Sequence, residues 1–142
     1  MQDKVFLDSN IVIYAYSTTD SNKQKTAKQL IMVGNTIIST QVLQEMINTF
    51  CRKLKVEYDI VKYLLQECIE NVNHLAINSQ LTIFLACDVA KRYGFSFYDS
   101  LIIAAALENN CTILYSEDLQ HNQVIEQRLR IINPFCLGIK NL

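Results

Sequence analysis

Four acidic residues stand at positions that favour one shared site. Asp8 ends a short apolar run, and Glu45 is in the opening turns of the helix expected after a second such run. Asp99 begins an apolar helix, and Asp118 lies just past another apolar run. In an open parallel α/β sheet, ligands bind beyond the carboxyl ends of the strands, so we expect all four acids to reach that edge. Clustered carboxylates without paired bases attract a hard cation such as Mg²⁺. The pattern therefore predicts metal-dependent phosphodiester chemistry, in which one ion activates water and another stabilises the leaving oxygen.

Each acid also has a purely structural interpretation, which the sequence leaves open. Asp8 is a good N-cap for the helix that follows it. Glu45 lies opposite the apolar stripe of its helix, a position that a solvated helix face explains as well as a functional role does. Asp99 comes three residues after Ser96, so the two form a possible capping box, although the apolar face of its helix indicates a desolvated setting. Asp118 would stabilise the N-terminus of a short helix expected after position 116.

Other kinds of chemistry are disfavoured. The two histidines, His74 and His121, have no recognisable nucleophile partner, so Ser- or Cys-based catalysis is not indicated. Gly34, Gly94 and Gly138 are too far apart to form a dinucleotide fingerprint or a P-loop, because both motifs need clustered glycines.

Short apolar runs alternate with segments of helical periodicity along the chain. We predict strands at residues 5–7, 36–39, 74–77, 112–115 and 130–132. We predict helices at residues 11–16, 21–33, 43–54, 57–71, 79–93 and 101–107. This order is typical of a parallel sheet with helices on both faces, so the expected fold is a three-layer α/β/α sandwich.

Composition predicts an ordinary globular domain. The chain has 142 residues, of which 50% are hydrophobic and 19% charged, and we expect one domain over residues 1–142. The formal net charge is −1, so any nucleic-acid contact must be local. The five cysteines are dispersed, which is typical of reduced thiols, and the longest apolar run is too short to span a membrane. We therefore expect a soluble cytoplasmic protein.

Five short motifs, taken in order, resemble those of PIN-domain ribonucleases, particularly the VapC-type toxins of type II toxin-antitoxin modules. They are Leu7-Asp8-Ser9-Asn10, Val42-Leu43-Gln44-Glu45, Phe97-Tyr98-Asp99-Ser100, Ser116-Glu117-Asp118-Leu119 and Ile132-Asn133-Pro134-Phe135. The resemblance covers nearly the whole chain. Two departures are visible, since Ser9 stands where the family often has Thr, and Asn122 stands where Gly is usual. Both are tolerable, because Ser keeps the hydroxyl and Asn enters the left-handed region readily.

The resemblance implies a three-layer PIN fold and endonucleolytic cleavage of RNA. It implies a Mg²⁺ or Mn²⁺ site whose ligands are acidic, namely Asp8, Glu45, Asp99 and Asp118. It further implies that Asn10 and Ser116 support these acids through hydrogen bonds or water. Such toxins are commonly homodimers, and an antitoxin neutralises them by inserting a basic side chain into the acidic pocket.

Basic residues offer candidate RNA contacts, because Lys and Arg clusters bind phosphates. Arg52 and Lys53 are favoured, since Arg52 lies about two turns beyond Glu45 on the same helix face. Lys23 belongs to a second cluster, for which an ordinary solvated face is the stronger interpretation.

Two other functions remain as alternatives. One is a catalytically degenerate PIN-like domain that only binds protein or RNA. The other is an aspartyl-phosphate phosphatase with Asp8 as nucleophile, which Asn10 disfavours because an amide cannot serve as the proton donor.

Overall fold

A computed structural model of the chain describes residues 3–136. Its helices are α1 (Ser9–Tyr16), α2 (Ser21–Val33), α3 (Thr40–Asn48), α4 (Tyr58–Asn71), α5 (Gln80–Tyr93) and α6 (Phe97–Glu108). Its strands are β1 (Val5–Leu7), β2 (Thr36–Ser39), β3 (His74–Ala76), β4 (Ile113–Tyr115), β5 (Val124–Ile125) and β6 (Leu129–Ile132). Each of the five strands and six helices whose ranges the sequence predicted overlaps one of these elements, whereas the short helix expected after position 116 does not form.

The strands form one sheet in the order β3-β2-β1-β4-β6-β5. All neighbours are parallel except β5 and β6, which pair antiparallel. The sequence predicted the parallel part of this sheet but gave no strand at residues 124–125, so it did not anticipate the antiparallel edge. The connection between the two strands, residues 126–128, contains Glu126 and Gln127, which both have positive φ, the backbone of a tight hairpin turn. Such a turn usually contains Gly or Asn, so the sequence carried no signal for it.

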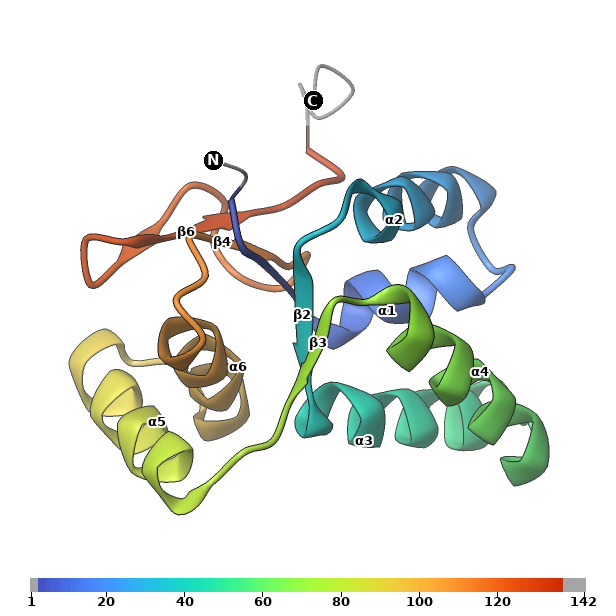
Figure 1. Cartoon of the computed structure of the whole chain (residues 1–142), viewed down its shortest axis with the longest axis horizontal. Coiled ribbons are helices and arrows are strands. Elements are labelled where there is room, and N and C mark those ends of the chain that lie inside the picture. Colours follow the sequence, from blue (N-terminus) through green and yellow to red (C-terminus); the bar gives the residue numbers. More distant parts are fainter. Residues whose placement is uncertain (1–2, 137–142) are drawn as a thin grey trace.

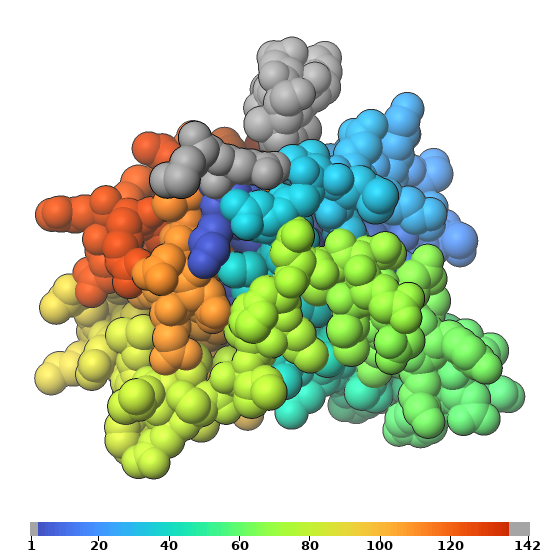
Figure 2. Space-filling view, viewed as in Figure 1, coloured from blue at the N-terminus to red at the C-terminus, as the bar shows by residue number. Residues whose placement is uncertain are grey.

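Helices cover both faces of the sheet (Figure 1). Helices α1 to α4 lie on one side, and α5 and α6 lie on the other. In the space-filling view, the dark blue segment near the N-terminus, which leads into β1, is visible only as a small area between its neighbours (Figure 2). The three-layer α/β/α fold predicted from the sequence is therefore confirmed.

Burial explains why the apolar segments form the elements that they do. Phe6 and Leu7 in β1 have no exposed surface, as expected for a strand packed on both faces. Every residue of α6 from Ser100 to Leu107 is buried, which matches its uniformly apolar sequence. Among the described residues, no helix is long and apolar enough to span a membrane.

Two local expectations are wrong. The helix expected to begin after position 116 is absent, and residues 116–120 form an irregular turn. Its backbone donors are engaged by side chains, since the Asp118 amide donates to Ser116 Oγ at 3.2 Å and the Glu117 amide to Asn10 Oδ1 at 3.1 Å. The long helix expected over 43–54 is instead α3 followed by a π-helical turn, Thr49–Lys53.

Asn122 has a φ of 71°, so it occupies the left-handed region as expected for the residue standing where Gly is usual.

Candidate active site

Asp8 lies at the carboxyl end of β1 and is only 5% exposed. Because Leu7 pairs with Tyr115, the residues that follow these two strands are neighbours. Ser116 Oγ donates a hydrogen bond to Asp8 Oδ2 at 2.7 Å, and the Ser9 amide donates to Asp8 Oδ1 at 2.7 Å. Asp8 is also the N-cap of α1, so the structural interpretation of this residue holds beside any functional one.

The environment of Asp8 disfavours its charged form. Burial raises the pKa of the carboxyl group to about 6, against the lowering effect of the hydrogen bonds from Ser116 and Ser9. The nearby negative charges of Glu45 and Asp118 raise it further. The apolar sequence of α6 favours Asp99 as the most desolvated acid, but the strand end buries Asp8 more deeply than the first turn of α6 buries Asp99.

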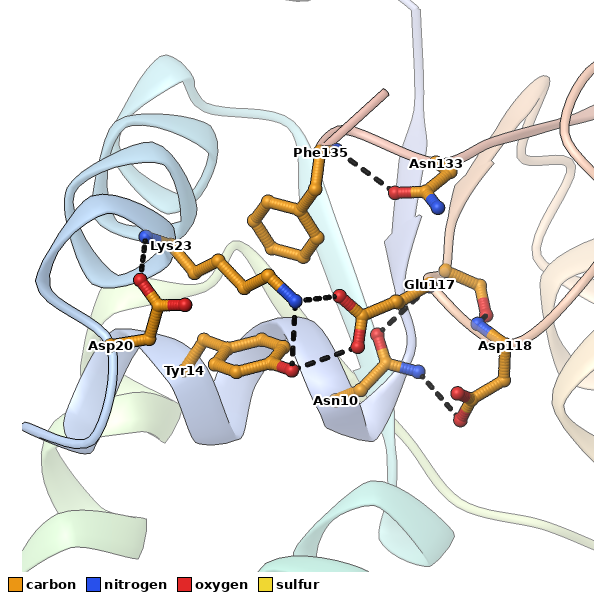
Figure 3. Close-up of polar contacts among 9 residues, drawn as sticks. Asn10, Tyr14, Asp20, Lys23, Glu117, Asp118, Asn133 and Phe135 are labelled. Atoms are coloured by element: carbon orange, nitrogen blue, oxygen red, sulfur yellow. Dashed lines mark hydrogen bonds and ion pairs between the residues drawn. The ribbon is translucent and has the colours of Figure 1, made fainter. Parts of the chain in front are cut away.

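Asn10 bridges two of the acids, and its contact with Asp118 is drawn in Figure 3. Its Nδ2 donates to Asp118 Oδ2 at 3.1 Å and lies 3.5 Å from Asp8 Oδ2. Its Oδ1 accepts from the Glu117 amide at 3.1 Å. An Asn side chain can do both because its amide carries a donor and an acceptor group. Ser116 and Asn10, both assigned supporting roles from the sequence, thus each contact Asp8.

Glu45 interacts electrostatically with two of the other acids, Asp99 and Asp118. The group is half-buried, and its Oε1 is buried without a hydrogen-bond partner. Burial raises the pKa of Glu45, hydrogen bonds from Ser9 and Gln41 oppose this, and the charges of Asp99 and Asp118 add to the increase. Half-burial and the buried Oε1 favour a place for Glu45 beside the other acids over a fully solvated helix face.

Asp99 lies in the first turn of α6, where Ser96 Oγ accepts a hydrogen bond from its amide at 3.2 Å. The cap of α6 therefore uses the Ser96 hydroxyl and the Asp99 backbone, which leaves the Asp99 carboxylate free for another role. Gln41, one turn before Glu45 in α3, donates from Nε2 to the Tyr98 carbonyl at 3.0 Å. This bond ties the helix that carries Glu45 to the helix that carries Asp99.

The structure thus connects all four acids through pairwise electrostatic interactions. Asp8 interacts with Glu45 and Asp118, and Glu45 interacts with Asp99 and Asp118. Neither ion pair found in the described part of the chain involves any of these acids. Within residues 3–136, however, no three His, Cys, Asp or Glu side chains are close enough together to enclose a metal ion.

The donor set nevertheless fits a hard cation. Every candidate ligand is an oxygen, and the buried Glu45 Oε1 has no partner. Burial is the main cause of the raised pKa at Asp8 and Glu45, and the neighbouring acids add a smaller repulsion that a divalent cation would relieve. Mg²⁺ usually keeps several of its waters, so its carboxylate ligands need not all converge on one point.

Of the two favoured basic residues, Lys53 lies beside the site. It lines a cavity of about 270 Å³ whose wall also contains Ser9, Asn10 and Tyr14. Arg52 lies in the same π-helical turn, and its guanidinium is 3.5 Å from Asn48 Oδ1.

Sequence reasoning missed the residues that hold the turn carrying Asp118. Lys23, assigned more readily to a solvated face, pairs with Glu117, and Tyr14 also donates to Glu117 (Figure 3). Residues 23 and 117 are 94 positions apart in sequence, so no local pattern pairs them. The one hint in the sequence was Glu117 itself, an acidic residue between Ser116 and Asp118.

Comparisons with known proteins agree with the fold that carries this candidate site. The PIN domain family model matches residues 5–126. VapC20 from Mycobacterium tuberculosis, described as a Sarcin-Ricin loop cleaving toxin, is similar in structure with a TM-score of 0.67 and 17% identity, over 80% of this chain and 89% of that one. VapBC2 from Rickettsia felis, bound to a DNA fragment from their promoter, gives a TM-score of 0.64 and 18% identity, over 89% and 96% of the two chains.

FitAcB from Neisseria gonorrhoeae gives a TM-score of 0.63 and 14% identity, over 94% of this chain and 99% of that one. These low identities establish a shared fold only. A comparison with curated protein sequences found no match. Because the family model matches most of its length, the chain belongs to the PIN domain family.

Proposed function

We propose that this protein is a metal-dependent endoribonuclease that cleaves RNA phosphodiester bonds and acts as the toxin of a toxin-antitoxin pair. The observation that carries the proposal is the buried Asp8 carboxylate, which Asn10 links to Asp118 and which interacts electrostatically with Glu45. Membership of the PIN domain family supports a nuclease. The fold shared with a toxin described as cleaving the Sarcin-Ricin loop supports RNA as the substrate.

Asp8, Glu45, Asp99 and Asp118 would hold Mg²⁺ or Mn²⁺. When bound, such ions supply an activated water and stabilise the leaving oxygen of a phosphodiester. Ser116 and Asn10 hold the Asp8 carboxylate in one orientation, since both bond to Oδ2. Asp8 must also lose its proton before it can bind a cation, so its raised pKa couples metal binding to pH.

Lys53 and Arg52 are the proposed RNA contacts. Lys53 lines the cavity that also contains Asn10, so a phosphate bound there would lie next to the acids. Removing one such contact should weaken RNA binding uniformly across sequences and lower the salt dependence.

The partner and the setting belong to the same proposal. A fold shared with VapBC2 supports a cognate antitoxin, and the resemblance to VapC-type toxins supports a homodimer. We further propose that the nuclease domain comprises residues 1–142 and that the protein acts in the cytoplasm.

The test compares the parent protein with two variants on the same RNA, with Mg²⁺ or Mn²⁺ added. Asp8→Asn keeps the shape of the side chain and removes its charge, whereas Asp88→Asn makes the same change at an exposed position of α5. Cleavage should be lost in Asp8→Asn and unchanged in Asp88→Asn. Equal cleavage by a folded Asp8→Asn protein would refute the metal-nuclease proposal.

The assay also separates the two alternatives. A phosphatase would release phosphate from a small phosphate ester and leave the RNA intact. A degenerate binding domain would bind RNA or protein and cleave neither substrate at any metal concentration.

A further inference from the structure

Glu117 stands between Ser116 and Asp118, but its side chain points away from the acids. It reaches toward α1 and α2, where Lys23 Nζ lies 2.5 Å from Glu117 Oε2 (Figure 3). The Tyr14 hydroxyl donates to Glu117 Oε1 at 2.8 Å, and Lys23 Nζ donates to the same hydroxyl oxygen at 3.3 Å. Both carboxylate oxygens of Glu117 are therefore engaged by residues from two helices.

Two aromatic rings enclose the cation of this cluster. Lys23 Nζ lies 4.8 Å from the centroid of the Tyr14 ring and 5.2 Å from that of Phe135. The two rings meet edge to face with their centroids 5.2 Å apart. A cation in this position gains from the ring faces, and the side chains of Lys23 and Glu117 are only 31% and 25% exposed, so the pair is more enclosed than the Arg92–Glu126 pair, whose side chains are 65% and 37% exposed.

The backbone around Glu117 provides the hydrogen bonds that orient the candidate site. The Glu117 amide donates to Asn10 Oδ1, which leaves the Nδ2 end of Asn10 directed at Asp118 and Asp8. If the Glu117 amide moved away, Asn10 would lose the contact that fixes which end of its side-chain amide faces the acids. In the same turn, Ser116 Oγ donates to Asp8 and accepts from the Asp118 amide.

We propose that Glu117, clamped by Lys23 and Tyr14, is a positioning residue that fixes the turn of residues 116–118 and thereby the orientation of Asp8, Asn10 and Asp118. This inference rests on the proposed nuclease function for its catalytic consequence. The claim that the Lys23–Glu117 pair fixes the turn concerns only hydrogen bonds within this chain, so it can be tested without RNA.

The second ion pair of the described chain is the matched control. Arg92 Nη1 lies 2.8 Å from Glu126 Oε2, and this pair joins α5 to the β5–β6 hairpin. Arg92 is 65% exposed at its side chain, compared with 31% for Lys23. It contacts none of the four acids. Arg92→Met therefore removes an ion pair by the same chemical change as Lys23→Met, at a place that has no connection with the site.

The first measurement is amide hydrogen exchange in the metal-free protein. In Lys23→Met and Glu117→Ala, we expect the Glu117 and Asp118 amides to exchange about tenfold faster or more, because the turn that protects them is released. Lys23→Arg restores the charge and should return exchange to the parent rate. Arg92→Met should leave both amides unchanged. Parent-like exchange of these amides in Lys23→Met would overturn the proposal, whatever happens to cleavage.

The second measurement separates kcat from KM for RNA cleavage with Mn²⁺. A positioning role predicts that kcat falls about tenfold in Lys23→Met while KM stays within about twofold, with recovery in Lys23→Arg. A higher KM with unchanged kcat would mean that Lys23 contacts RNA, and it would overturn the proposal. An equal fall in Arg92→Met would attribute the effect to general destabilisation and would also overturn it. If the parent cleaves no RNA, the proposed function fails, and amide exchange still decides whether the Lys23–Glu117 pair positions the turn.

Discussion

Replacing Asp8 by Asn should change how the stability of the protein depends on pH. The pKa of Asp8 is raised from 3.8 to about 6 in the folded protein, chiefly by burial. A carboxyl group with a raised folded pKa favours the folded state most below its unfolded pKa. That contribution is lost as pH rises through the folded pKa. The metal-free parent should therefore become less stable between about pH 4 and pH 7, and Asn, which does not titrate, should not contribute to this loss.

The size of the effect follows from the shift. The two pKa values differ by about two units, and each unit corresponds to about 1.4 kcal/mol, so the full penalty is about 3 kcal/mol. Applying the linkage relation, Asp8 costs about 1 kcal/mol at pH 4.5 and about 3 kcal/mol at pH 7.5. Relative to Asp8→Asn, the parent should thus lose about 2 kcal/mol of unfolding free energy over this range.

Urea denaturation followed by circular dichroism, with a chelator present, measures this difference. Asn also changes the hydrogen bonds to Ser9 and Ser116, but that cost does not vary with pH and cancels from the slope. A parent and variant whose unfolding free energies run parallel from pH 4.5 to 7.5 would refute the burial of a charged Asp8. Mn²⁺ at neutral pH should stabilise the parent and have little effect on the variant, because a ligand stabilises only the state that binds it.

Three further outcomes are expected. Ser116→Ala should lower the unfolding free energy by about 1–3 kcal/mol and raise the pKa of Asp8 further, because a buried hydrogen bond that favours the carboxylate is lost. Urea denaturation measures the first effect, and NMR of the carboxyl carbon measures the second. Asp99→Asn should keep the melting temperature of the parent, since Ser96 makes the cap of α6, while RNA cleavage falls by more than about tenfold. If the melting temperature and cleavage fell together, the role of Asp99 would be structural. Calorimetric titration with Mn²⁺ at pH 6 should release about half a proton from Asp8, seen as a binding enthalpy that depends on the buffer, and an enthalpy independent of the buffer would contradict that release.

The sequence alone determined which segments fold and where the acids fall along them. Short apolar runs such as residues 5–7 predict buried strands because both faces of a parallel sheet are covered, and α6 is apolar on every side because it is packed on every side. Since parallel strands end at the same edge, the position of an acid directly after a strand is enough to assign it to that edge. Local periodicity and strand direction carry this information, and both are properties of neighbouring residues.

Only the tertiary structure decided how deeply each acid is buried and what holds it. Asp8 is the most buried of the four because β1 lies between β2 and β4 in the sheet, an order that local patterns do not contain. The turn at residues 116–118 replaces the expected helix because the Asn10 side chain and the Ser116 hydroxyl capture its backbone donors. The pairing of Lys23 with Glu117 depends on α2 and the turn after β4 meeting in space. Such contacts between distant segments are set by the packing of the whole chain, so no window of sequence encodes them.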